Sequence, residues 1–243
     1  FHTAHSPSQL ARACVIALGV PELNLLAVAP DTSTGHDAVA AMKDALERIP
    51  RGVFFSGSKF IRPDEPDIGA AVSSEYDDFH YLHGAKTLLM LWSGQRPPIH
   101  AIAATNPGRF GIRLALCGDM DASAEPDQPA PALDGVTSYF YSLPRNPAND
   151  WLVAEAAERA REKPDAAMAD GMSAAIALVQ ALTSARSSEA DDLVSRLEGL
   201  SFETPSGRVT IAPNDHQALQ AVYQFRIEPP SSLPQLVREI SDP

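Results

Sequence analysis

The chain has 243 residues, enough for one large domain or for two smaller ones that each bury a core. Its formal net charge is −12, which argues against nucleic acid and against an anionic membrane surface, because both attract basic proteins. No stretch of about 18 residues is apolar without a charge or a proline, so we expect no membrane insertion. The start at Phe1 lacks the basic and apolar regions of a signal peptide, so we expect a mature or truncated product.

The first 120 residues alternate between helical periodicity and short apolar runs. Apolar residues at helical spacing predict helices over 7–18, 37–49, 68–83 and 98–106. Apolar runs predict buried strands over 23–29, 53–55, 86–92 and 113–117. This alternation is typical of βαβ units, so we predict an α/β protein with a parallel sheet flanked by helices on both faces.

The second half has a different rhythm. Residues 122–132 are rich in Ala, Pro, Asp and Glu, which predicts a loop or linker. A strand-like run at 136–141 precedes predicted helices over 149–161, 165–184 and 189–197 and strands over 208–211 and 221–227. The proline-rich tail over 229–243 predicts irregular surface structure.

Two cysteines, Cys14 and Cys117, stand in apolar surroundings. Free cysteine is among the most buried residue types, so we expect two small buried side chains, while a disulfide between them stays open. The chain has no Cys-x-x-Cys pair, which argues against zinc and thioredoxin-like chemistry.

Motifs of catalysis and of nucleotide binding are missing from the sequence. It has no G-x-x-x-x-G-K-[ST], no G-x-G-x-x-G after a strand and no G-x-S-x-G. No nucleophile, base and orienting group stand at the spacing that a reaction requires. We therefore expect no catalytic residue, no cofactor and no enzyme, and instead a protein that binds a small molecule without reacting with it.

The run from Asp77 to His83 is the best metal candidate. On a helix, Asp77, His80 and His83 share one face. This spacing is common by chance, and a metal site needs further ligands from elsewhere. We therefore favour a solvated polar face and assign no metal site.

Three segments follow apolar strands and carry small or hydrogen-bonding residues, at 31–35, 92–95 and 118–121. In an open α/β sheet, ligands bind beyond the carboxyl ends of the strands. The predicted ligand-binding residues are Thr34, Trp92, Gln95, Asp119 and Asp121. Either aspartate would pair with a ligand ammonium group or would cap the next helix, and both interpretations stay open.

A longer pattern, FxTPxGxVTxxxxxHQALQxVY, runs from Phe202 to Tyr223. Upstream, Pro147-Ala148-Asn149 precedes a predicted helix, and Phe1-His2-Thr3 precedes another. With these motifs the chain resembles, up to about Glu228, the Leu/Ile/Val type of periplasmic substrate-binding protein, which binds branched-chain amino acids.

The resemblance implies a periplasmic-binding-protein-like type I fold, in which three crossovers join two α/β lobes and the ligand lies between them. It implies that residues 1–142 and 219–243 form the second lobe. Residues 143–218 would be the remainder of the first lobe, whose N-terminal part is absent from this chain. The helices over 165–197 would then expose apolar faces, which mark an interface or instability.

The resemblance also implies a function. The expected protein captures an amino acid or a related small polar molecule in the periplasm for an ABC importer; a sensory, regulatory or accessory subunit is the alternative. Its expected partners are the membrane permease or a protein that completes the first lobe. Thr34 and Asp170 stand where tyrosines are common in the family, so the solute stays open between branched-chain amino acids and other small polar or aromatic compounds.

Overall fold

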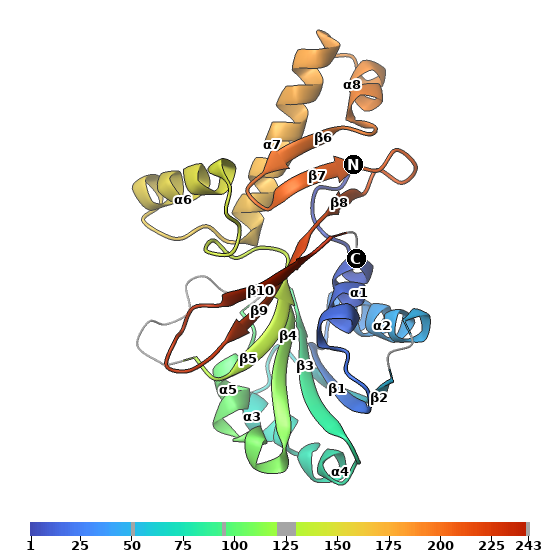
Figure 1. The fold of residues 1–243 in the computed structure, drawn as a ribbon, viewed down its shortest axis with the longest axis vertical. Coiled ribbons are helices and arrows are strands. Elements are labelled where there is room, and N and C mark those ends of the chain that lie inside the picture. The colour runs from blue at the N-terminus through green and yellow to red at the C-terminus, as the bar shows by residue number, and fades with distance from the viewer. Residues whose placement is uncertain (50–51, 94–95, 121–129, 242–243) are drawn as a thin grey trace.

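The computed structural model describes residues 1–49, 52–93, 96–120 and 130–241. Its strands form a seven-stranded sheet of order β10-β9-β5-β4-β3-β1-β2 and a three-stranded sheet of order β6-β7-β8 (Figure 1). In chain order the strands are β1 Leu23–Pro30, β2 Val53–Ile61, β3 Ala85–Trp92, β4 Ile112–Gly118, β5 Leu133–Thr137, β6 Ser201–Thr204, β7 Gly207–Ile211, β8 Ala218–Gln220, β9 Val222–Ile227 and β10 Gln235–Ile240. The helices are α1 Pro7–Leu18, α2 Ser33–Arg48, α3 Ile68–Ser73, α4 Tyr76–His80, α5 Ile99–Ala104, α6 Pro147–Arg159, α7 Ala166–Ala185 and α8 Ala190–Leu197, with a 3-10 turn at Pro107–Phe110.

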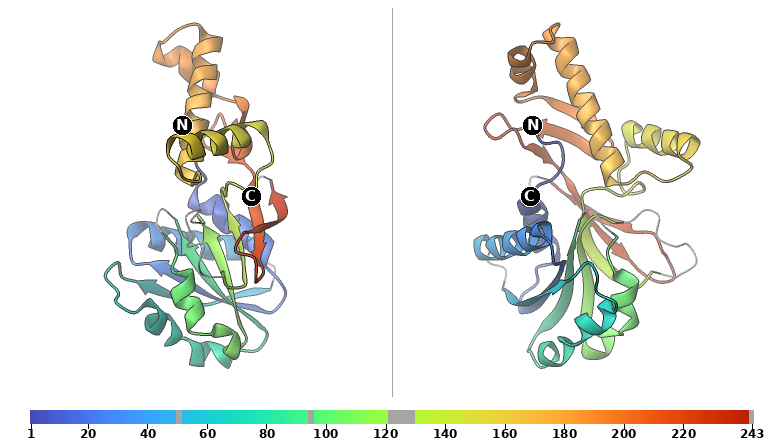
Figure 2. Two further views of the ribbon diagram at one scale, coloured as in Figure 1. Left: turned by 90° about the vertical axis from the view of Figure 1, so that its left-hand side faces the viewer. Right: turned by 180° about the vertical axis from the view of Figure 1, so that it is seen from behind.

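Helices cover both faces of the large sheet (Figures 1 and 2). Strands β1 to β5 are parallel, and β9 and β10 join them antiparallel at one edge. One core cluster packs the sheet against α1 and α2, and a second packs it against α3, α4 and α5. The predicted α/β architecture is confirmed, with all eight residues of β1 buried as expected for a central strand.

Local sequence signals explain how the two helices beside β1 begin. Ser6 caps α1 in a capping box: the Gln9 N–H donates to Ser6 Oγ and the Ser6 N–H donates to Gln9 Oε1. Thr32 caps α2 by accepting from the Gly35 N–H at 3.2 Å. Helix α2 therefore starts four residues earlier than predicted. A side chain at Gly35 would collide with the carbonyl oxygen of Pro30, so glycine is needed where α2 packs on the end of β1.

A disulfide joins Cys14 of α1 to Cys117 of β4, with the Cα atoms 6.2 Å apart. Both residues are buried, as the sequence predicts. The pairing was left open by the sequence, and the preference for two free thiols was wrong. The bond links the helix to the carboxyl end of a central strand.

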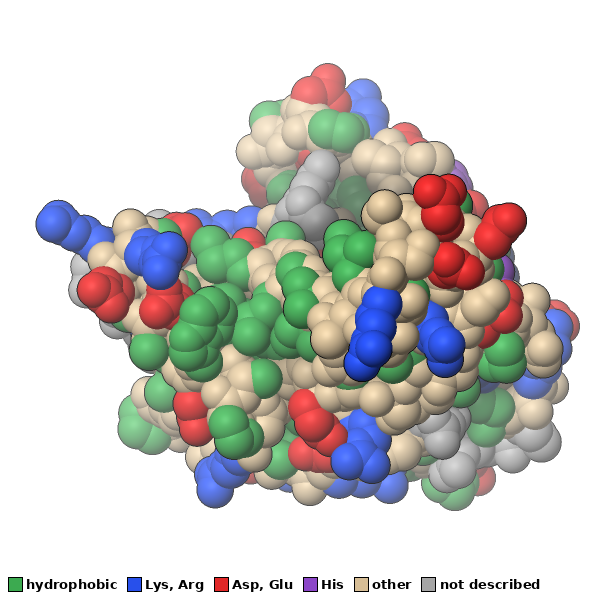
Figure 3. All heavy atoms as spheres, turned by 90° about the horizontal axis from the view of Figure 1, so that it is seen from above, with side chains coloured by type: hydrophobic (Ala, Val, Ile, Leu, Met, Phe, Trp, Pro, Cys, Tyr) green, Lys and Arg blue, Asp and Glu red, His purple; other side chains and the backbone are tan. Residues whose placement is uncertain are grey.

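The three-stranded sheet has helices α6, α7 and α8 around it. Helix α7 buries the small side chains Ala169, Ser173, Ala177 and Ala181 along one face, and none of α8 is buried. The opposite face of α7 carries Leu178 and Val179, which are 49% and 60% exposed. Seen from this end of the molecule, hydrophobic side chains form a broad surface patch (Figure 3).

By length and composition alone, α7 also meets the criterion for a membrane-spanning helix. Core helices of globular proteins meet the same criterion. Asp170, the fifth residue of α7, interrupts its apolar sequence, and Ala177 packs with Phe202 and Val209 in a core cluster. We therefore assign α7 to a globular core.

Three segments connect the two sheets. The N-terminal segment runs beside residue 217, where the His2 N–H donates to the His216 carbonyl at 2.9 Å and the Ala218 N–H donates to the His2 carbonyl at 2.9 Å. The second segment lies between β5 and α6, and the third is the short step from β8 to β9.

Some sequence expectations were wrong in detail. The tail expected to be irregular contains β10, which pairs with β9. The helix expected over 68–83 is two short helices that end at His80, and β6 and β8 were not predicted. Most of the predicted linker over 122–132, namely residues 122–129, lies outside the described residues.

Candidate functional site

A pocket of about 190 Å³ opens at the carboxyl edge of the large sheet, between α1 and α2. The walls come from the start of both helices and from the ends of three strands. Its lining residues are His5, Pro7, Leu10, Ala11, Pro30, Thr34, Gly35, Ala38, Leu91, Trp92, Ser93 and Cys117. None of them is acidic, and most are apolar, so the pocket suits a small, largely apolar group.

Strand order brings the predicted edge residues together. Trp92 ends β3 opposite Gly118 of β4, and the Asp119 N–H donates to the Trp92 carbonyl at 3.0 Å. A side chain at Gly118, whose φ is +141°, would collide with that same carbonyl oxygen. This close contact therefore places the ends of β3 and β4, where two of the predicted ligand-binding segments begin, side by side.

The structure separates the roles of the predicted residues. Thr34 lies in the first turn of α2 and lines the pocket. Trp92 also borders it, but its side chain packs with Met90 and Leu116 in the cluster on the other face of the sheet. Because side chains alternate along a strand, Leu91 faces the pocket and the indole does not. Gln95 and Asp121 lie outside the described residues.

Asp119 lies beside this pocket rather than among its lining residues. One carboxylate oxygen, Oδ1, accepts from Ser138 Oγ at 3.1 Å. Burial, together with the charges of Asp119 and Asp165, raises the pKa of Asp170 on α7 from 3.8 to about 6. The charge of Asp119, after β4, thus acts on the carboxyl group of Asp170 in α7 and favours its protonated form.

His5 is a lining residue that the sequence reasoning missed. Its Nδ1 lies 3.2 Å from Gln220 Nε2, which donates because an amide nitrogen carries hydrogens. Burial lowers the pKa of His5 to about 4, against backbone hydrogen bonds to Gln220 and Ala221 that raise it, so the ring is neutral at pH 7. Within the described residues, neither His5 Nε2 nor Trp92 Nε1 has a hydrogen-bond partner. A lone histidine before a helix gives no sequence signal of this, because Gln220 is 215 residues away.

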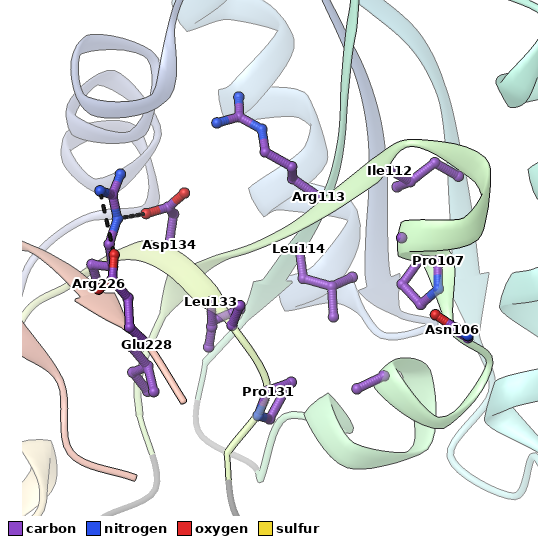
Figure 4. A pocket seen from close by; sticks show the side chains of 14 residues that line it. Asn106, Pro107, Ile112, Arg113, Leu114, Pro131, Leu133, Asp134, Arg226 and Glu228 are labelled. Carbon is purple, nitrogen blue, oxygen red and sulfur yellow. Dashed lines mark hydrogen bonds and ion pairs between the residues drawn. The ribbon is translucent and has the colours of Figure 1, made fainter. Parts of the chain in front are cut away.

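A second pocket, of about 420 Å³, lies at the opposite edge of the sheet, where β4 and β5 begin (Figure 4). Leu114, Leu133 and Pro131 line its interior, and Arg113 projects from the other side of β4. The rim residue Arg226 is already paired, with its Nε 2.6 Å from Asp134 Oδ1. The pocket is larger than the first but lies away from the carboxyl ends, where α/β sheets bind ligands.

The metal candidate does not assemble. His80 ends α4 and its Nδ1 lies 3.0 Å from the Phe110 carbonyl, while His83 lies beyond the helix. Among the residues with described positions, no group of three or more His, Cys, Asp or Glu side chains could hold a metal ion.

Comparison with known proteins identifies the family. The family model described as "Periplasmic binding protein" matches residues 1–232. The chain belongs to this family. A solved ABC-type branched-chain amino acid transporter protein from Rhodopseudomonas palustris is 32% identical, with a TM-score of 0.82, over 100% of this chain and 66% of that one.

More distantly similar solved structures share the fold. A solute-binding protein of an R. palustris ABC transporter, solved with 3,4-dihydroxybenzoic acid, is 17% identical with a TM-score of 0.76, over 99% of this chain and 66% of that one. An amino-acid ABC transporter substrate-binding protein from Pseudomonas fluorescens is 13% identical with a TM-score of 0.73, over 97% and 64%. The chain thus spans just under two thirds of the length of these structures. No curated protein sequence matches it significantly.

Proposed function

We propose that this chain is the larger part of a solute-binding protein that captures a small molecule for an ABC importer and does no chemistry on it. The observation that carries the proposal is the pocket at the carboxyl edge, whose described lining residues are mostly apolar and include no acidic group. Membership in the periplasmic binding protein family supports the proposal, as does the similarity to a branched-chain amino acid transporter protein.

Pocket size limits the solute. A cavity of about 150 Å³ is enough for benzene, and drug-sized ligands need about 300 Å³ or more. The 190 Å³ pocket therefore suits one ring or one branched aliphatic chain. Amino acids and small aromatic acids both meet this limit, and a ligand ammonium group would find Asp119 next to the lining residue Trp92. Thr34 and Ser93 offer hydroxyl groups to the polar end of the solute.

We further propose the lobe boundaries given by the sequence, with residues 1–142 and 219–243 in one lobe and 143–218 in part of the other. A segment equivalent to the remaining third of the similar chains would cover the exposed face of α7 and form the opposite wall of the cleft. The apolar side chains of Leu178, Val179 and Leu182 on that face support this assignment.

The proposed cycle follows from this architecture. Solute binding would close the two lobes about the three connecting segments, a hinge motion, and a membrane permease would bind the closed form. The proposed location is the periplasm, where an importer meets its solute. The disulfide between α1 and β4 supports an oxidising compartment.

A thermal-shift screen of the protein with both lobes tests the proposal, using L-leucine, other amino acids, benzoate and 4-hydroxybenzoate. A solute at 100 times its Kd stabilises a protein by about 2.7 kcal/mol, which is several degrees in Tm. Ala38 lines the pocket and Ala40 on the same helix is exposed. We expect Ala38→Leu to reduce the shift and Ala40→Leu to leave it unchanged. No shift with any compound, or equal shifts in both variants, would contradict the proposal.

A further inference from the structure

The sequence pattern that runs from Phe202 to Tyr223 brings its beginning and its end together in the structure. Its early part contains the two-residue turn Pro205-Ser206 between β6 and β7 of the small sheet, and Tyr223 is the second residue of β9 in the large sheet. The Tyr223 hydroxyl donates to the Ser206 carbonyl at 3.0 Å, and both residues are buried. A side chain of the large sheet thus holds a turn of the small sheet.

A second bond reaches the same turn from the connecting segment between β5 and α6. Asn146 Nδ2 donates to the Pro205 carbonyl at 3.1 Å, and Asn146 Oδ1 caps α6 by accepting from the Asn149 N–H at 2.9 Å. The Asn149 side chain in turn donates to the carbonyls of Tyr141 and Pro144 in that segment. The turn is therefore bonded to the connecting segment as well as to the large sheet.

The other two connecting segments are bonded to each other. Gln217 Nε2 donates to the Ala4 carbonyl at 2.8 Å, and Gln220 Nε2 donates to the Thr3 carbonyl at 2.8 Å. These side-chain bonds add to the backbone pairing between the N-terminal segment and the residues around β8. The first and third connections thus form one ribbon, which leads directly into β9.

Tyr223 lies where this ribbon and the remaining connection enter the large sheet. It follows the step from β8 to β9, and it pairs with Thr137, the last residue of β5, after which the second connecting segment begins. Its ring belongs to the same core cluster as Phe140 and Leu143 of that segment. Hinge motion concentrates backbone rotation in connecting segments, so a side chain rooted between two of them stays near the axis of the motion.

We propose that Tyr223 is a positioning residue whose hydroxyl, through the Ser206 carbonyl, holds the small sheet on the large sheet at the pivot about which the cleft closes. This inference rests on the proposed function. Tyr223 is not among the described residues that line the pocket, so it acts without touching the solute. Loss of the bond lets the ligand-free protein sample more orientations of its two sheets, and closure around a solute then costs more conformational entropy.

Three substitutions in the two-lobed protein test the proposal. Tyr223→Phe removes the hydroxyl and keeps the buried ring. Tyr76→Phe is the matched control, because Tyr76 is equally buried and its hydroxyl lies 2.8 Å from Thr105 Oγ1 beside the large sheet. Asn146→Ser is a second test variant, since a serine oxygen still caps α6 while the amide donor to Pro205 is lost.

Two measurements are made on each variant. Calorimetry gives Kd for L-leucine, benzoate and 4-hydroxybenzoate. Spin labels on cysteines introduced at the exposed positions Ala40 of α2 and Glu158 of α6 give the distribution of distances between the two parts, with no solute present. The native cysteines Cys14 and Cys117 are joined in a disulfide and do not take a thiol-specific label.

For the probe that binds, we expect Tyr223→Phe and Asn146→Ser to raise Kd about 2- to 12-fold, the factor that corresponds to about 0.5–1.5 kcal/mol for one neutral hydrogen bond. Both variants should also broaden the ligand-free distance distribution. Tyr76→Phe should lower Tm and change neither Kd nor the distribution, because its bond lies away from the connecting segments.

An unchanged Kd or an unchanged distance distribution in Tyr223→Phe, whatever its Tm, would overturn the role of Tyr223 and leave the proposed function standing. Equal changes in the Tyr76→Phe control would overturn it as well, since they would reflect general destabilisation. If the wild type binds none of the probes, the proposed function is contradicted. The ligand-free distances then decide separately, and an unchanged distribution in Tyr223→Phe would overturn the pivot.

Discussion

The two sheets of this molecule differ in how their apolar surfaces are covered. In the seven-stranded part, β1 and β3 lie between helices on both faces, and residues such as Leu89 and Leu116 are fully buried. In the three-stranded part, α7 buries one face of small residues and leaves Leu178 and Val179 exposed. In the first part, helices of the chain itself cover both faces of the sheet. In the second part, α7 has the apolar composition of a core helix, but its outer face is left uncovered.

This difference concerns function as well as stability. The large sheet holds one wall of the pocket in a fixed place, because a disulfide and a tight glycine edge secure it. The small sheet approaches that wall through Asp170 of α7, whose pKa responds to Asp119. A rigid wall facing an incomplete one is the arrangement expected when a cleft closes by moving one lobe against another.

The largest effect on the free energy of unfolding is expected from removing the disulfide that joins α1 to β4. The disulfide spans 103 residues, and a loop of about 100 residues gives a stabilisation near 4.7 kcal/mol in the chain-entropy account. We expect the double variant Cys14→Ser with Cys117→Ser to lose about 3–5 kcal/mol of unfolding free energy in urea titrations. A loss below about 1 kcal/mol would show that packing alone holds α1 on β4.

Leucine truncations compare the two parts directly. Leu116→Ala opens a cavity at a fully buried site and should cost about 3 kcal/mol of unfolding free energy. Leu178 is 49% exposed, so Leu178→Ala should cost about 0.5 kcal/mol or less in this chain. In a protein that carries both complete lobes, the cost of Leu178→Ala should rise to about 2 kcal/mol. Equal costs for Leu178→Ala in the two proteins would mean that nothing covers α7.

An effect smaller than those of the disulfide and of Leu116 concerns the pH dependence of Asp170. Its pKa is raised to about 6 in the folded protein, so the folded state binds this proton more tightly than the unfolded state. This contribution is fully present below pH 4 and is lost as the pH rises through 6. Because the side chain is partly solvated, we expect Asp170→Asn to gain only about 1 kcal/mol at pH 7 relative to wild type.

The advantage of Asp170→Asn should disappear near pH 4, where the wild-type carboxyl is protonated. Urea titrations of both proteins at pH 7 and pH 4 measure it, and Asp150→Asn on the exposed face of α6 is the control. A difference that does not change with pH would show that folding does not raise the pKa of Asp170.

Hydrophobic patterns predicted the large sheet well, because buried parallel strands need continuous apolar runs. They failed for β10, an edge strand whose residues are almost all exposed and therefore carry no pattern. They also placed the start of α2 too late. The run Ser33-Thr34-Gly35 has turn composition, yet the Thr32 cap and the close approach of Gly35 to Pro30 make it helical.

The candidate site was predictable only in its place. The rule that ligands bind beyond the carboxyl ends of strands selected the edge where Thr34 lies. It could not show that the Trp92 side chain packs on the far face, since alternation needs a known strand register. The contact of His5 with Gln220 and the disulfide pairing could not be predicted for another reason. The residues that meet stand 215 and 103 residues apart in the sequence.

Hydrogen exchange on the two-lobed protein, with and without a solute that raises its Tm, tests the central claim most directly. The claim is that solute binds at the carboxyl edge of the large sheet. We predict slower exchange in the first turn of α2, at Ser93 and at Asp119, and unchanged exchange at the start of β4 and β5 around Leu114 and Leu133. Protection confined to that opposite edge would place the solute in the larger pocket and contradict the account.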